Sequence, residues 1–152
     1  MNNKLFISIV VIVILIGVMW LTAPRGAKGP ERVEDVIWKM FSAALAGDTQ
    51  QYIDCFSGPP RDVLEENRKQ TTEVAFQDYI RRDVQDIKAL SIINGQQEDA
   101  QRAVFEVEAV YPDRNENQIF SLQKIQGKWK IVSISRPVIT KQPIPYLEQV
   151  VK

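Results

Sequence analysis

Residues 102–136 read RAVFEVEAVYPDRNENQIFSLQKIQGKWKIVSISR, and the other segments of the chain can be placed around them. The first part alternates, because apolar side chains occupy every second position while Glu106 and Glu108 lie between them. Such alternation is typical of a strand with one buried face. The positions that we expect to be buried are Ala103, Phe105, Val107, Ala109 and Tyr111.

Two turns divide the rest of this stretch into further strands. The sequence PDRN at residues 112–115 favours a turn, and a second strand is expected at 118–125. Gly127 can take the positive φ that a tight hairpin needs, so a third strand is expected at 128–135. Pro137 limits further pairing. The pattern predicts an antiparallel meander.

Helices are expected before these strands. Residues 32–46 have apolar side chains at intervals of three and four, which predicts an amphipathic helix. Gly47-Asp48 would end it and begin a second, short helix at 49–56. Further helical segments are expected at 61–70 and around 76–80.

A first strand is expected after Val84, where the period changes to two, and Asn94-Gly95 would end it. One face of this strand would carry Ile87, Ala89, Ser91 and Ile93. Helices followed by about four antiparallel strands predict an α+β domain, in which the helices cover one face of a curved sheet.

Three segments together resemble one known family. The run FSAALAGDTQQYIDCF at 41–56, the helical segment after it and the closing hairpin IQGKWKIVSI at 125–134 look like the nuclear-transport-factor-2-like superfamily, the cone-shaped, cystatin-like fold that SnoaL-like proteins share. The resemblance covers roughly residues 32–136. It implies a pocket between the sheet and the helices, and an open sheet face that is often a dimer surface. It implies no particular activity, since this fold hosts many functions.

Composition excludes several classes of site. The sequence has 19 basic and 19 acidic residues, but three of the basic ones, Lys4, Arg25 and Lys28, precede residue 31. The chain from residue 31 onward therefore has 16 basic and 19 acidic residues and a net charge of about −3. We therefore expect no nucleic-acid partner. The sequence has no histidine and a single cysteine, Cys55, so we expect no metal site, no cofactor and no internal disulfide. Cys55 lacks a histidine that could activate it and is interpreted as a buried thiol.

A membrane anchor is expected at the N-terminus. Residues 5–21, LFISIVVIVILIGVMWL, contain no charge and would reach about 25 Å as a helix, enough for a thin bilayer. Trp20 suits the interface, and TAP at 22–24 is a poor cleavage site, so an uncleaved anchor is favoured over a signal peptide.

The expected organisation has five parts. They are an N-terminal tail at 1–4, a transmembrane signal-anchor helix at 5–22, a linker at 23–30, the α+β domain at 31–136 and an extended C-terminal tail at 137–152. The charges that flank the span favour a cytoplasmic domain slightly, whereas a short N-terminal tail favours export. We expect a single-pass protein whose domain is exported, on the periplasmic or extracytoplasmic side.

Candidate functional residues fall into three groups. Glu106 and Glu108 share one strand face, and two such carboxylates could act as a general base, although both are expected to face away from the core. Aromatic and apolar residues would either line a ligand pocket or fill the core: Phe41, Leu45, Tyr52, Phe56, Tyr79, Phe105, Phe120 and Trp129. A homodimer surface on the open sheet face would use Val104, Val110, Ile119 and Ile125.

Four functions remain open. The leading interpretation is a membrane-anchored, non-catalytic domain that binds a partner protein, including a second copy of itself, or a small ligand through the cone pocket or the open sheet face. The first alternative is a small-molecule isomerase or lyase that uses a strand carboxylate as general base. The second is a scaffold subunit of a bacterial envelope assembly, because the architecture resembles the bitopic scaffold subunits of type IV secretion machines. The third is a cleaved, secreted form of the same domain.

Overall fold

The computed structural model describes residues 32–141, which belong to one compact unit of the chain, Arg32–Lys152. The expected N-terminal tail, anchor and linker lie outside the described residues, as does the C-terminal tail from residue 142 onward. Within residues 32–141, no helix is both long enough and apolar enough to cross a bilayer.

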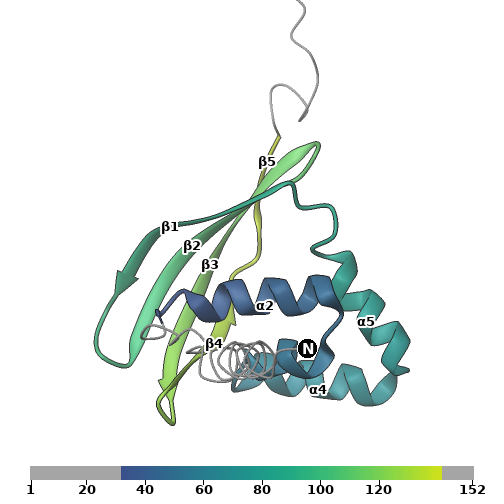
Figure 1. Ribbon diagram of the computed structural model, residues 1–152. Coiled ribbons are helices and arrows are strands. Elements are labelled where there is room, and N and C mark those ends of the chain that lie inside the picture. The colour runs from purple at the N-terminus through teal and green to yellow at the C-terminus, as the bar shows by residue number, and fades with distance from the viewer. Residues whose placement is uncertain (1–31, 142–152) are drawn as a thin grey trace, which may run out of the picture. The chain divides into compact units, whose positions relative to one another are not determined.

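Four helices come first in the described chain (Figure 1). They are α2 (Asp35–Ala46), α3 (Thr49–Asp54), α4 (Pro59–Gln70) and α5 (Glu73–Arg82). Gly47 has φ 71° and caps α2, and its N–H is directed at carbonyls in the last turn of that helix. The Asp48 side chain then accepts a hydrogen bond from the backbone N–H of Gln51 and begins α3. The expected change of helix at Gly47-Asp48 is confirmed.

Five strands follow and form one antiparallel sheet in the order β1-β2-β3-β4, in which β5 also pairs with β3. They are β1 (Ala89–Gln97), β2 (Arg102–Val110), β3 (Arg114–Ile125), β4 (Lys128–Ile134) and β5 (Val138–Lys141). The α+β class and the meander of β2, β3 and β4 are confirmed. Figure 1 shows the curved sheet with the helices gathered beside one of its faces.

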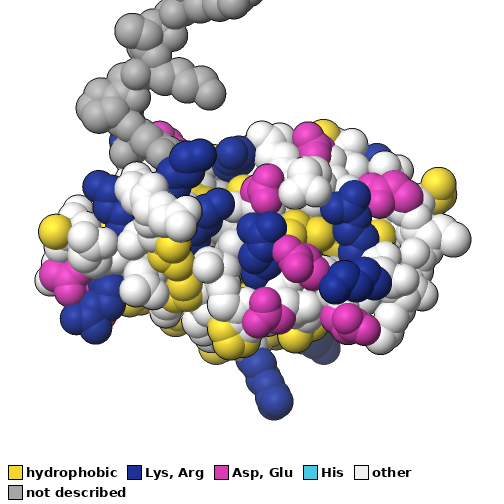
Figure 2. Space-filling model, turned by 90° about the horizontal axis from the view of Figure 1, so that it is seen from below, with side chains coloured by type: hydrophobic (Ala, Val, Ile, Leu, Met, Phe, Trp, Pro, Cys, Tyr) yellow, Lys and Arg dark blue, Asp and Glu magenta, His cyan; other side chains and the backbone are white. Residues whose placement is uncertain are grey.

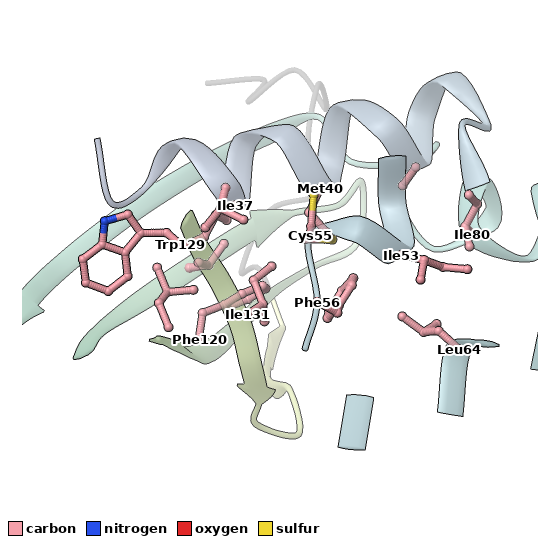
Figure 3. Close-up of a cluster of buried hydrophobic side chains, with 14 of the residues drawn as sticks. Ile37, Met40, Ile53, Cys55, Phe56, Leu64, Ile80, Phe120, Trp129 and Ile131 are labelled. Carbon is pink, nitrogen blue, oxygen red and sulfur yellow. The ribbon is translucent and has the colours of Figure 1, made fainter. Parts of the chain in front are cut away.

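The hydrophobic core lies between the helices and that inner face of the sheet (Figure 3). Ile37 from α2, Phe120 from β3 and Ile131 from β4 are each at most 1% exposed. Backbone hydrogen bonds also join the two layers at the edge of β4. The Ser57 N–H donates to the Ile131 carbonyl at 3.0 Å, and the Ile131 N–H donates to the Cys55 carbonyl at 2.8 Å.

The residues of β2 that face the helices are those that the sequence alternation predicts to be buried. Ala103, Val107, Ala109 and Tyr111 are all buried, and Phe105 is partly buried against the core. The return strand agrees as well, since Trp129 and Ile131 are buried while Lys128 is exposed. These positions confirm that a period of two marks the buried face.

The first strand differs from its prediction in two respects. Leu90 and Ile92 pack against the core, so the face that carries Ala89, Ser91 and Ile93 is the outer one. The strand also continues through Asn94-Gly95, where the pairing register shifts between Ile93 and Gln96. Asn94 has φ 50°, which fits a bulge. The Asn-Gly pair is therefore an irregularity within the strand and not its end.

Two sheet boundaries also differ. β3 begins at Arg114 and not at 118, so half of the expected turn is strand. Pairing resumes after Pro137, because β5 bonds to the first part of β3 from Asn117↔Val138 to Arg114↔Lys141. Pro137 interrupts the sheet between β4 and β5 without ending it.

Candidate functional site

A cavity of about 490 Å³ lies between the helices and the end of the sheet at which β2 turns into β3. Its walls are formed by residues from α2, α3, the end of α5 and the segment after it, β2, the β2–β3 turn, β3 and β4. They are Met40, Phe41, Tyr52, Arg82, Asp83, Val84, Asp86, Ala109, Tyr111, Pro112, Asp113, Arg114, Glu116, Gln118, Phe120 and Ile134.

The cavity exists where the inner face of β3 changes from apolar to polar. Phe120 is buried in the core, but Gln118 and Glu116 follow it on the same face toward the start of the strand. Glu116 is paired with Ala109 on β2, whose side chain is small. Polar side chains opposite an alanine leave unfilled space, because buried polar groups must keep hydrogen-bonding partners and cannot pack as a core does.

One wall of the cavity is apolar and aromatic. Phe41 and Phe120 lie with ring centroids 6.3 Å apart, and Met40 and Ile134 lie beside them in the lining. Tyr52 adds its ring, which packs on Phe56 at 5.2 Å between centroids. Burial raises the pKa of Tyr52 well above its ordinary value, so its hydroxyl stays protonated. This wall suits the hydrocarbon part of a small molecule.

Another part of the lining is charged, and Arg114 lies at its centre. Its Nε donates to Glu116 Oε1 at 2.7 Å, and its Nη1 donates to Asp113 Oδ1 at 3.0 Å. The guanidinium carbon also lies 4.3 Å from the centroid of the Tyr111 ring. Arg114 therefore neutralises charge on two carboxylates and stacks on an aromatic face.

Asp83 lies where the helical layer meets this charged wall. The Tyr111 hydroxyl donates a hydrogen bond of 3.0 Å to the Asp83 backbone carbonyl and ties the segment after α5 to the sheet. Burial raises the pKa of the Asp83 carboxyl above its ordinary value; Arg82 opposes that rise and Glu116 adds to it. Within residues 32–141, the Asp83 and Asp86 side chains form no hydrogen bond or ion pair with another residue.

No protein-family model and no curated protein matches this sequence. Among solved structures, the chain is similar to a crystal structure described as an NTF2-like protein of unknown function from Shewanella baltica OS155. The similarity has a TM-score of 0.47 and 15% sequence identity, and it covers 73% of this chain and 91% of that chain.

Three of the residues predicted to form a pocket line this cavity: Phe41, Tyr52 and Phe120. The other five lie elsewhere. Phe56 and Trp129 are buried in the core, and Phe105 packs against it. Leu45 and Tyr79 are 58% and 47% exposed on α2 and α5, and Tyr79 lines a separate, smaller cavity of about 160 Å³.

The two candidate catalytic carboxylates, Glu106 and Glu108, lie on the outer face of the sheet and not in the cavity. Glu106 accepts a hydrogen bond from Asn94 Nδ2 at 2.9 Å, and Glu108 accepts one from Asn115 Nδ2 at the same distance. Neither lines the cavity, so neither can act on a molecule bound there.

The residues predicted for a dimer surface share that outer face. Ile119 is 42% exposed, whereas Val104, Val110 and Ile125 are half-buried. Ile93 of β1 is paired beside Glu106 and is 37% exposed. Polar side chains separate these apolar ones on the outer face.

Neither a thiol nucleophile nor a metal ligand set lines the cavity. Burial raises the pKa of the Cys55 thiol to about 11, although Lys39 and Lys130 oppose that rise. Cys55 is 1% exposed and packs in the core. Among residues 32–141, no three acidic or cysteine side chains are grouped so that they could hold a metal ion.

The charged residues of the cavity, above all Asp83, Arg114 and Glu116, were absent from the predicted site. A signal for two of them exists in the sequence, since Arg114, Glu116 and Gln118 continue the alternation of Phe120 and Leu122 backwards. Three polar side chains on the inner face of a strand indicate a pocket. No comparable signal identifies Asp83, whose position depends on the way the chain leaves α5.

Proposed function

We propose that this domain is a non-catalytic binding domain that takes up a small organic molecule in the cavity between α2 and the β2–β3 end of the sheet. The cavity itself carries the proposal. Its volume of about 490 Å³ lies within the range of about 300–1,000 Å³ that is usual for ligand sites. It has an aromatic wall for a hydrocarbon body and a charged wall that fixes orientation.

Binding is favoured over catalysis by the chemistry of the lining. The Arg114 guanidinium is already bonded to Glu116 and Asp113. The cavity lining contains neither a thiol nor a histidine. A nucleophile or base must be activated by a neighbouring group, whereas Arg114, Glu116 and Asp113 are bonded to one another.

The proposal can be tested with a substitution that fills the cavity without changing its charge. Ala109 lines the cavity and Ala89 lies nearby on the outer face of the same sheet, exposed. We expect Ala109→Leu to abolish the binding of small molecules that the unmodified chain takes up from a fragment mixture, as measured by saturation-transfer NMR on the full chain in a non-ionic detergent. Ala89→Leu adds the same side chain outside the cavity and should leave binding unchanged. Equal binding by both variants would overturn the proposal.

A proton-transfer enzyme is the second candidate, and one observation favours it. Asp83 lines the cavity, and burial raises the pKa of its carboxyl, with a contribution from Glu116. A cavity carboxyl with a raised pKa is a candidate general base. If the domain is an enzyme, the unmodified chain should catalyse proton exchange at a bound ligand, and Asp83→Asn should abolish this exchange while binding persists. If it is a binding domain, neither the unmodified chain nor the variant should catalyse exchange.

We further propose that residues 5–21 anchor the domain in a membrane and that the domain is exported. The support is the uncharged apolar run of the sequence. Protease treatment of intact cells and of opened cells tests the orientation, because an exported domain is digested once the outer barrier is opened while the inner membrane stays sealed. Mass spectrometry of the N-terminus tests cleavage, and loss of the apolar run would contradict the anchor.

A further inference from the structure

The cavity carries an excess of negative charge. Its lining includes the carboxylates of Asp83, Asp86, Asp113 and Glu116 against the guanidinium groups of Arg82 and Arg114, so the formal charge is −2. The four acids are not equally available. Asp113 and Glu116 are bonded to Arg114, at 3.0 and 2.7 Å.

Asp83 and Asp86 are the carboxylates that a ligand can approach. Within residues 32–141 neither side chain has a hydrogen-bonding partner or an ion pair in the protein, and the neighbouring Arg82 forms no ion pair within 4 Å. Asp83 is also partly withdrawn from water and lies near Glu116, which together raise its pKa. A positive charge at this place would offset both effects, since a cation favours the ionised carboxylate.

The apolar part of the lining adds a second preference. Phe41, Phe120 and Tyr52 present aromatic rings, and Met40 and Ile134 complete an apolar surface. Such a surface takes up a hydrocarbon body and also attracts an ammonium group through the ring faces. An inorganic cation would leave this surface in contact with water, whereas an organic one covers it.

We expect selection by charge to come mainly from the groups that line the cavity. Basic and acidic side chains are interspersed on the face of the domain that Figure 2 shows, and no single sign of charge gathers there. The chain from residue 31 onward is only mildly acidic, at about −3. Attraction over long distances is therefore weak, and at physiological salt only charges within about 8 Å of the ligand act on it strongly.

We infer that the ligand of this cavity is an amphipathic organic cation, in which an ammonium group lies against Asp83 and Asp86 and an apolar body lies against Phe41, Phe120 and Tyr52. This inference depends on the proposed function and names its ligand class. An anionic ligand would meet two unpaired carboxylates, and of the two arginines only Arg82 is not already bonded to carboxylates of the cavity.

Three small ligands of similar shape test which ligand charge the cavity prefers. Phenethylamine, phenethyl alcohol and 3-phenylpropionate have the same aromatic body with a positive, neutral or negative end. We expect the full chain in a non-ionic detergent at neutral pH to bind the amine at least about tenfold more tightly than the carboxylate, as a single close charge pair allows. Ligand-observed NMR titration measures the three dissociation constants.

A variant in which Asp83 and Asp86 lose their charge tests whether these two carboxylates select the cation. In Asp83→Asn/Asp86→Asn, the preference for the amine over the carboxylate should fall to about twofold or less. Phenethyl alcohol should bind as before, which shows that the cavity is intact. The matched control Asp62→Asn removes an exposed carboxylate at the start of α4, outside the cavity, and should keep the full preference.

The outcomes separate the two proposals. Equal binding of the three probes, tighter binding of the carboxylate, or a preference that survives in the double variant overturns the cation inference and leaves the proposed function standing. If none of the probes binds while other fragments bind in a manner sensitive to Ala109→Leu, only the cation inference fails. If no fragment binds in that manner, the proposed function fails as well.

Discussion

The hydroxyl of Tyr111, which follows β2, donates a hydrogen bond of 3.0 Å to the backbone carbonyl of Asp83, which follows α5. This contact joins the segment after the helices to the sheet beside the cavity. It also places the Asp83 side chain among the residues that line the cavity. Together with the backbone bond from the Lys88 N–H to the Val110 carbonyl at 2.7 Å, it holds the segment after α5 against the sheet.

Removing that hydroxyl should loosen the wall. Tyr111→Phe retains the ring and leaves a partly buried carbonyl without its donor, so we expect the free energy of unfolding to fall by about 1 kcal/mol. Urea unfolding followed by tryptophan fluorescence measures this change. Tyr79→Phe removes a hydroxyl from a tyrosine that is 47% exposed on α5 and should be nearly neutral. Equal effects of the two substitutions would show that the Tyr111 bond contributes nothing.

Removing Arg114 should slightly destabilise the fold and make the cavity more negative. Arg114→Gln leaves Glu116 and Asp113 without their cation, and because the pair lies at the surface the loss of stability should stay below about 1 kcal/mol. If the ligand is a cation, its affinity should increase several-fold, by roughly the effect of one close charge. Calorimetric titration of the variant with phenethylamine measures the increase.

Arg61→Gln is the matched control for this change. Arg61 bonds to Glu65 at 2.7 Å, the distance that joins Arg114 to Glu116, but it lies on α4 outside the cavity. It should cost a similar amount of stability and leave binding unchanged. A decrease in amine affinity in Arg114→Gln alone would mean that Arg114 itself holds the ligand.

Gly95 should tolerate no side chain while Phe105 is present. A Cβ at Gly95 would collide with the Phe105 ring across the bulge of β1, so we expect Gly95→Ala to destabilise the fold by about 1–3 kcal/mol. Thermal unfolding measures the loss. In Phe105→Leu the ring is gone, and adding Gly95→Ala to it should cost much less than in the unmodified chain. Additive losses would place the cause in the backbone of the bulge.

The buried thiol of Cys55 should make the fold less stable in alkali. Its pKa is raised from an ordinary value of 9.0 to about 11, so the folded state retains the proton longer than the unfolded state does. The contribution is fully present below about pH 9 and is lost as the pH rises through about 11. Urea unfolding between these pH values should show a steeper decline for the unmodified chain than for Cys55→Ala. Parallel curves would mean that the thiol does not contribute.

The sequence predicted those parts of the fold in which one local signal was strong. In β2 the acidic residues Glu106 and Glu108 mark the outer face, so Val107 and Ala109 could be assigned to the core. In β1 both faces carry isoleucine, at Ile92 and Ile93, and alternation alone cannot choose between them. Asn94-Gly95 favours a hairpin turn as strongly as a bulge, and only pairing with β2 decides which one forms.

The candidate site was less predictable because it depends on contacts between distant segments. Phe41, Tyr52 and Phe120 could be proposed from their residue types, but the same residue types fill the core at Phe56 and Trp129. What separates the two sets is the small side chain of Ala109 opposite the polar Glu116. Sequence alone does not show that these two positions face each other.

Two backbone hydrogen bonds join β4 to the segment after α3, from the Ser57 N–H to Ile131 and from the Ile131 N–H to Cys55. They determine how this part of the domain opens locally. The amide hydrogens of Ser57 and Ile131 lie in different layers of the domain, yet each is shielded from solvent deuterium by the same short ladder. Their exchange should therefore proceed through one shared opening event, in which the segment after α3 separates from β4. Since Ile131 is fully buried, such an opening exposes the core, and both amides belong to the slowest-exchanging set.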